Sequence, residues 1–86
     1  MTSNLNDPAY RTFVARLAAL RTASGVTQSE LAARLGRPQS YVSKIERHER
    51  RIDPAEFWRI ARALGADPAA AFAEVAAGLA EGVEAG

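Results

Sequence analysis

Apolar residues recur at spacings of three and four along most of the chain, which is the periodicity of an α-helix with one buried face. The first run has apolar residues at positions 10, 13, 14, 17 and 20, and predicts a helix over 8–23. Similar runs predict further helices over about 28–35, 39–47 and 54–64, and from 68 onward. No stretch alternates with period two, so the pattern predicts a compact, all-α fold of five helices.

Helix start signals stand in front of these runs. Asp7 and Asp53 each precede a proline, which suits a helix cap followed by the first helical position. Thr27 and Glu30 have the spacing of a capping box, in which each side chain bonds the backbone amide of the other. Glycines follow the expected helix ends at positions 25, 36 and 65.

The last predicted helix contains glycines near its far end. Gly78 and Gly82 weaken the far part of the last helix, because glycine costs about 1 kcal/mol relative to alanine inside a helix. We therefore expect a flexible arm over 1–7, one folded domain over 8–77 and a frayed tail over 78–86.

Charge is distributed unevenly along the 86 residues. The net charge is only +1, but all eleven basic residues lie between Arg11 and Arg62, where only five acidic ones occur. That stretch carries +6 and the remainder carries −5. A basic body with acidic ends favours a polyanionic partner.

Composition excludes several other classes of protein. The chain has no cysteine, which excludes disulfides and thiolate metal sites, and His48 is its one histidine. No metal, cofactor or catalytic set is therefore expected, and the protein is not expected to be an enzyme. No apolar run is long enough to span a bilayer, and positions 1–10 lack the pattern of a signal peptide, so we expect a cytoplasmic protein.

Two of the predicted helices form the most specific feature of the sequence. The helix over 28–35 and the helix starting at Gln39 are joined by a tight turn at Gly36, which is the helix-turn-helix arrangement. The second of them presents a polar outer face with Gln39, Ser40, Ser43 and Lys44. A major groove admits one helix whose short polar side chains bond base edges, so this pattern predicts reading of double-stranded DNA.

The series of residues around this turn resembles the Cro/C1-type helix-turn-helix family of phage repressors and bacterial xenobiotic-response (XRE) regulators. The resemblance runs through the segments 27–32, 35–36, 41–47 and 60–65 and covers about 17–68 of the chain. It implies a lambda-repressor-like DNA-binding domain and a transcriptional regulator, with repression as the expected action. It also implies a bacterial or phage-type protein that is associated with the nucleoid.

The resemblance assigns roles to individual residues. It implies base reading by Gln39, Ser40 and Lys44, flanked by Ser43. It implies phosphate or positioning contacts for Gln28, Thr27, Tyr41, Arg47, Arg50 and Arg51. It further implies a partly buried ion pair between Arg21 and Glu46. Two departures concern the ends of the reading helix, because His48 stands where relatives often have glycine and Pro38 removes a backbone amide.

A single domain of this size makes few DNA contacts, so we expect a homodimer on a palindromic operator, with half-sites about 34 Å apart. Phe72, Val75 and Leu79 are the candidate dimer residues, although their spacing equally suits packing on the first or fourth helix. Two alternative functions remain open at this stage. One is an antitoxin or restriction-modification controller of the same fold, and the other is a helix-turn-helix module that binds a protein.

Overall fold

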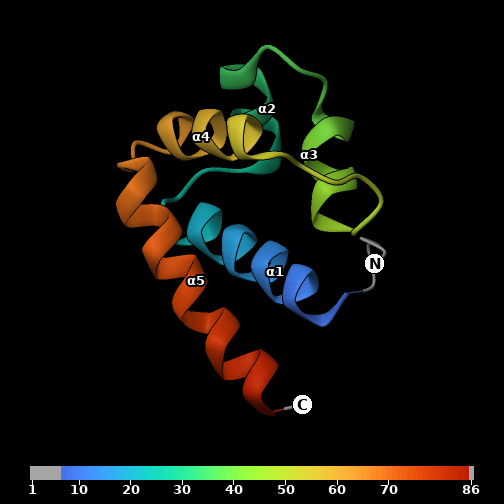
Figure 1. The fold of residues 1–86 in the computed structure, drawn as a ribbon. Helices are drawn as coiled ribbons and strands as arrows, with labels where there is room; N and C mark the ends of the chain where they lie inside the picture. The colour runs from blue at the N-terminus through green and yellow to red at the C-terminus, as the bar shows by residue number, and fades with distance from the viewer. Residues whose placement is uncertain (1–6, 86) are drawn as a thin grey trace.

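The computed structural model describes residues 7–85 as five helices, and it describes side chains up to Leu79. The helices are α1 (Pro8–Ala23), α2 (Gln28–Leu35), α3 (Gln39–Glu46), α4 (Pro54–Ala63) and α5 (Pro68–Ala85). Figure 1 shows α1 in the middle of the molecule, α5 crossing beside it, α4 and α2 on one side, and α3 at the edge away from α5. Residues 7–85 contain no strand, so the all-α expectation is confirmed.

The helices begin at the residues that the cap signals indicate. The Asp7 carboxylate accepts a hydrogen bond from the backbone amide of Tyr10. Thr27 and Glu30 form the predicted capping box, and Asp53 and Glu56 form a second one at the start of α4. Because each cap supplies partners to amides that have none inside the helix, the start of each element is decided locally.

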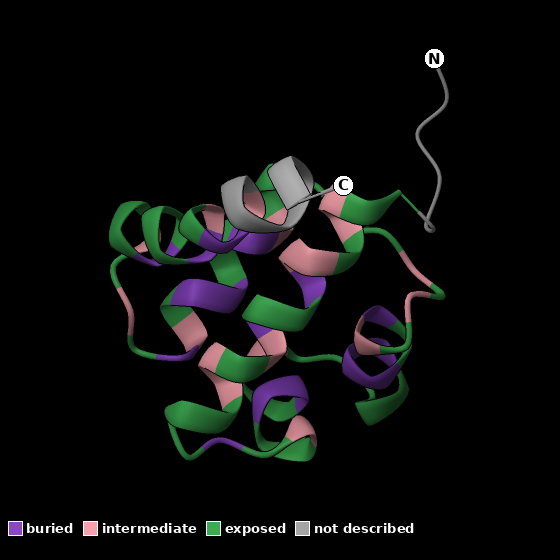
Figure 2. Cartoon of the chain, turned by 90° about the horizontal axis from the view of Figure 1, so that it is seen from below, coloured by how far each residue is buried: buried purple, intermediate pink, exposed green. Residues whose placement is uncertain are grey.

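The core lies where α1, α2, α3 and α4 meet. Leu31, Val42, Ile45 and Ile60 are each 2% exposed and pack together with Leu17 and Phe57. Figure 2 shows the buried segments turned toward the interior of the bundle. Over residues 7–85, none of the helices combines the length and apolar character that a membrane crossing requires.

Helix α5 extends further than the sequence suggested. It continues to Ala85, across the segment expected to be a frayed tail. Gly78 is buried, and a β-carbon at this position would lie 2.7 Å from Arg16 Nε. Arg16 also donates to the Glu74 carbonyl at 3.3 Å, so α1 covers the helix at the point where glycine was expected to weaken it. The arm expected over 1–7 lies, apart from Asp7, outside the described residues.

The turns on either side of α3 explain its length. Gly36 ends α2 in the left-handed conformation (φ 69°), and Pro38 is the extended residue before α3. After α3, His48 adopts φ 63°, and it is the one non-glycine residue with positive φ among residues 7–85. This conformation explains why glycine is favoured at this position, since a side chain there costs about 1–2 kcal/mol.

Candidate nucleic-acid interface

The outer face of α3 is polar and open to solvent. Gln39, Ser40 and Lys44 are all exposed, and Gln39 and Ser40 form the first turn of the helix. Pro38 supplies no side-chain cap, so the amides at this end of α3 have no side-chain acceptor. This face therefore offers donors and acceptors in two adjacent helical turns, with one cation among them.

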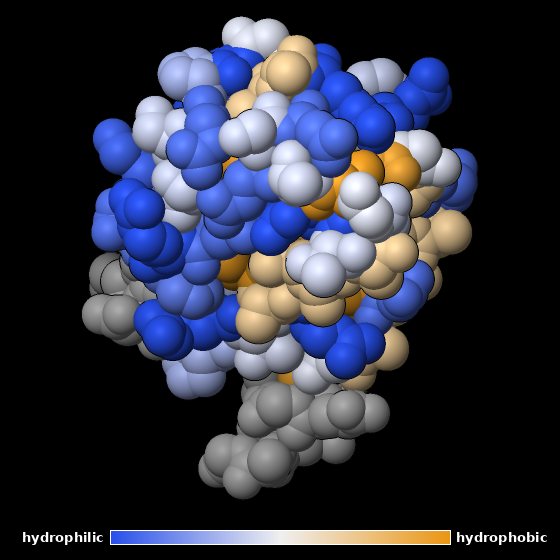
Figure 3. Space-filling view, turned by 180° about the vertical axis from the view of Figure 1, so that it is seen from behind, coloured by the Kyte–Doolittle hydropathy of each residue, from blue (hydrophilic) through white to orange (hydrophobic). Residues whose placement is uncertain are grey.

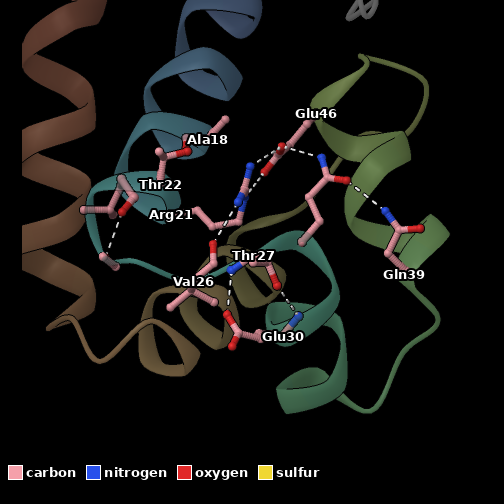
Figure 4. Close-up of polar contacts among 11 residues, drawn as sticks. Ala18, Arg21, Thr22, Val26, Thr27, Glu30, Gln39 and Glu46 are labelled. Carbon is pink, nitrogen blue, oxygen red and sulfur yellow. Dashed lines mark hydrogen bonds and ion pairs between the residues drawn. The ribbon is translucent and has the colours of Figure 1, made fainter.

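Gln39 is held by a chain of hydrogen bonds that crosses three helices. Its Nε2 donates to Gln28 Oε1 at 2.8 Å, and Gln28 Nε2 donates to Glu46 Oε1 at 2.8 Å. Arg21 Nε donates to Glu46 Oε2 at 2.7 Å, and Arg21 Nη1 donates to the Val26 carbonyl at 2.8 Å. Figure 4 shows this network running from α1 to the end of α3 and on to Gln39.

The ion pair implied by the resemblance is thus present. The Arg21 and Glu46 side chains are each 15% exposed, and a second contact joins Arg21 Nη2 to Glu46 Oε1 at 3.0 Å. The pair ties the end of α3 to α1, while Gln28 extends it to the start of α3. Through these contacts the Arg21–Glu46 pair fixes the orientation of α3 and so of its outer face.

Two residues expected to flank this face point inward instead. Ser43 is 9% exposed, donates to the Ser40 carbonyl at 3.3 Å and accepts from Arg47 Nη1 at 3.4 Å. Tyr41 is 8% exposed and its hydroxyl donates to Glu56 Oε2 at 3.1 Å. Both side chains are covered, because Arg47 folds back over Ser43 and the guanidinium groups of Arg37 and Arg50 lie over the Tyr41 ring. Burial is the main cause that raises the pKa of the Tyr41 phenol, and the hydrogen bond to Glu56 raises it further.

The arginines after α3 are not equivalent. Arg47 forms an exposed pair with Glu49 at 3.1 Å, in which the guanidinium lowers the pKa of the Glu49 carboxyl. Arg50 pairs with Glu56 at 3.1 Å and lies 4.8 Å from the Tyr41 ring centroid, so its contacts are internal. The guanidinium of Arg51 is exposed and lies 4.4 Å over the Tyr10 ring.

The first residue of α2, Gln28, belongs to the hydrogen-bond chain that holds Gln39. Thr27 is exposed, and its backbone amide donates to Glu30 Oε1 at 2.8 Å. Hydrogen bonds from the Thr27 amide and hydroxyl lower the pKa of Glu30. Glu30 therefore stays ionised at neutral pH and holds the first turn of α2, from which Gln28 projects.

Sequence reasoning overlooked Arg37. It lies in the turn between α2 and α3, is exposed, and stacks 4.6 Å from the centroid of the Tyr41 ring. Its position directly before Pro38 in the helix-turn-helix segment was a usable signal, because a cation in that turn adjoins the first turn of α3.

The candidate dimer residues separate into two groups. Val75 is 1% exposed and packs within the chain, which is the alternative that its spacing also suited. Phe72 is 49% exposed and lies beside a groove of about 600 Å³ between α1, α4 and the start of α5. Trp58, 52% exposed, lines the same groove, while Leu79 is half-buried.

Apolar surface is not confined to one groove. The face opposite that of Figure 1 is largely hydrophilic, with a patch of apolar side chains near its centre (Figure 3). A domain this small cannot cover all its apolar atoms. The groove beside Phe72 is distinguished by its aromatic lining, in which Phe13, Phe57 and Phe72 lie in mutual contact.

Comparisons with known proteins agree with this geometry. The family described as "Helix-turn-helix domain" matches residues 12–75 of the chain. A solved structure, an XRE-family like protein from Pseudomonas syringae pv. tomato str. DC3000, is 49% identical, with a TM-score of 0.74. That match covers 80% of this chain and 84% of the other. No curated protein matches the chain. The chain therefore belongs to the Cro/C1-type, or XRE, helix-turn-helix family, a family of DNA-binding regulators.

Proposed function

We propose that this protein is a sequence-specific transcriptional repressor that binds a palindromic operator as a homodimer, with α3 in the major groove. The observation that carries the proposal is the exposed first turn of α3, where Gln39 is held in place by Gln28. A side chain that is already oriented loses less conformational entropy when it bonds a base.

The Gln28–Gln39 bond leaves the hydrogen-bonding groups that adenine requires. Gln39 Nε2 carries two hydrogens and gives one to Gln28. The second hydrogen and the Oε1 oxygen match adenine N7 and N6, the bidentate contact that glutamine makes in the major groove. Ser40 and Lys44 then read neighbouring base edges from the same face.

Phosphate contacts position the reading helix. In this proposal the start of α2, where Thr27 is exposed and Gln28 is half-buried, binds one phosphate, supported by the positive end of the helix dipole. Arg47 and Arg51, which follow α3, bind others. Arg47 first leaves its exposed pair with Glu49, which costs little because exposed ion pairs contribute about 0–1 kcal/mol.

We place the dimer contact at the groove beside Phe72. Phe72 is 49% exposed, so it offers a large apolar side chain to a second copy. The groove is lined mainly by apolar groups, with Phe13, Phe57 and Phe72 in mutual contact, so a second copy related by a two-fold axis would cover the same apolar surface on each chain. Leu79 lies seven residues beyond Phe72 on α5 and extends the same contact.

The test is selection of bound duplexes from a random DNA pool, followed by fluorescence anisotropy with the selected site and a scrambled site. Gln39→Ala is expected to lose about 1–3 kcal/mol on the selected site and little on the scrambled one. Arg51→Ala is expected to weaken both duplexes alike and to reduce the slope of log affinity against log salt by about one.

Equal losses on both duplexes for Gln39→Ala would contradict base reading by α3. A pool without palindromic enrichment, or a protein that remains monomeric at the concentrations that saturate the site, would contradict the dimer.

A further inference from the structure

A second cationic surface lies away from α3, between the ends of α2 and α4. It is a hollow of about 420 Å³ lined by Arg34, Leu35, Trp58, Arg59, Arg62 and Ala63, which we call the Arg–Trp hollow. Three of the six residues are arginines and none is acidic. The end of α4 that contributes Arg62 lies across the molecule from α3 (Figure 1).

The arginines of the hollow have no acidic partner within the described part of the chain. The three ion pairs found there involve other residues. Arg34 Nη1 donates to the Ala63 carbonyl at 2.7 Å, and Arg62 lies 5.2 Å over the Trp58 ring. Glu30 is within electrostatic reach of Arg34, but its carboxylate is bonded to Thr27. The hollow therefore gathers positive charge whose guanidinium groups form no ion pair among residues 7–79.

The lining is also partly apolar. Leu35 is half-buried and Trp58 is 52% exposed, so their side chains present carbon surface between the guanidinium groups. Tryptophan and arginine together dominate the binding energy of many protein interfaces. A partner that fits both kinds of group carries carboxylates and at least one aliphatic or aromatic side chain.

We propose that the Arg–Trp hollow binds an acidic peptide segment of a partner protein, with an apolar side chain against Trp58 and carboxylates on Arg59 and Arg62. Charge complementarity argues for this partner, and the apolar lining favours a peptide over a phosphate backbone, which has no side chain to bury. The base-reading candidates Gln39, Ser40 and Lys44 do not line the hollow. The inference does not rest on the repressor function proposed above.

The experiment uses the intrinsic fluorescence of Trp58, the one tryptophan of the chain. The probe is a blocked hexapeptide in which four glutamates surround two leucines, and the control peptide has lysines in place of the glutamates. The acidic peptide is expected to change the fluorescence saturably, with an affinity that falls as salt is added. The lysine peptide is expected to give no saturable change.

The variant Arg59→Gln/Arg62→Gln is expected to bind the acidic peptide about tenfold more weakly, or roughly threefold for each exposed pair lost. Arg11→Gln removes an exposed arginine of α1 outside the hollow and is expected to leave peptide binding unchanged. Circular dichroism melting checks that both variants fold, and both are expected to bind random duplex DNA as the native chain does.

Unchanged peptide affinity in the double variant, or no saturable response to the acidic peptide, overturns the proposal. A fall in duplex affinity specific to the double variant overturns it in favour of a phosphate contact. A response to the acidic peptide that is lost when the protein is raised to concentrations at which it is dimeric overturns it in favour of a second copy on the hollow. None of these results bears on base reading by Gln39, which is tested separately.

Discussion

The buried ion pair at the centre of the interface gives the sharpest stability prediction. Glu46 accepts hydrogen bonds from Arg21 Nε at 2.7 Å, Arg21 Nη2 at 3.0 Å and Gln28 Nε2 at 2.8 Å. Glu46→Gln keeps the shape but removes the charge, and its amide brings a donor into a site that already holds three. Arg21 then remains largely buried beside a neutral group.

The magnitude follows from the burial of the pair. Removing one partner of a buried pair costs about 3–5 kcal/mol. Because both side chains are 15% exposed, we expect the lower end, about 3 kcal/mol. For a domain of this size the melting temperature should fall by about 12–24 °C.

Urea and thermal denaturation followed by circular dichroism measure the loss. Glu49→Gln is the matched control, since it removes a carboxylate–arginine pair at 3.1 Å in which the side chains are 57% and 52% exposed. We expect the control to cost at most about 1 kcal/mol. The double variant Arg21→Met/Glu46→Leu replaces both charges by apolar groups and should lie within about 2 kcal/mol of the native chain.

The reasoning is refuted if Glu46→Gln costs no more than Glu49→Gln. It is also refuted if the double variant is as unstable as the sum of its single substitutions, because the cost is attributed to leaving one buried charge without its partner.

Three further predictions concern single residues. His48→Gly should stabilise the fold by about 0.5–1 kcal/mol in urea denaturation, because φ is 63° and His48 Nδ1 is buried without a hydrogen bond. The gain is smaller than the strain itself, since glycine also loses more conformational entropy on folding. A loss of stability would contradict strain at this turn. Thr27→Ala should raise the pKa of Glu30 in a carboxyl NMR titration. Because the pKa of Glu30 is lowered in the folded state, its ionised carboxylate stabilises the fold above the unfolded pKa near 4.5, and this stabilisation is lost as the pH falls through the folded pKa. The native chain should therefore lose more stability on acidification than Thr27→Ala does. Tyr41→Phe should cost about 1 kcal/mol by removing the hydrogen bond to Glu56. Because the pKa of the Tyr41 phenol is raised in the folded state, the native chain should lose stability as the pH rises above about 10, and Tyr41→Phe should abolish this loss. An unchanged alkaline profile in the variant would exclude Tyr41 as the source of the loss.

Local signals in the sequence determined the helices and where they begin. The Thr27–Glu30 and Asp53–Glu56 capping boxes involve residues three apart, so they form from the same turn of chain in any fold that keeps the helix. Glycine at position 36 ends α2 for an equally local reason, because it accepts the left-handed conformation. The exposed positions of Gln39, Ser40 and Lys44 also followed from the helical period, since Val42 and Ile45 define the opposite face.

Tertiary structure decided what the helical period could not. Ser43 and Tyr41 are buried by Arg47 and by the start of α4, which no spacing within α3 reports. Gly78 strengthens the packing of α5 because Arg16, on α1, needs the space that a side chain would fill. Arg34 and Arg62 share the Arg–Trp hollow although 28 positions separate them, and Phe72 meets Phe13 from the far end of the chain. Each of these contacts depends on how whole helices cross, and the free energy of that crossing is spread over the entire core.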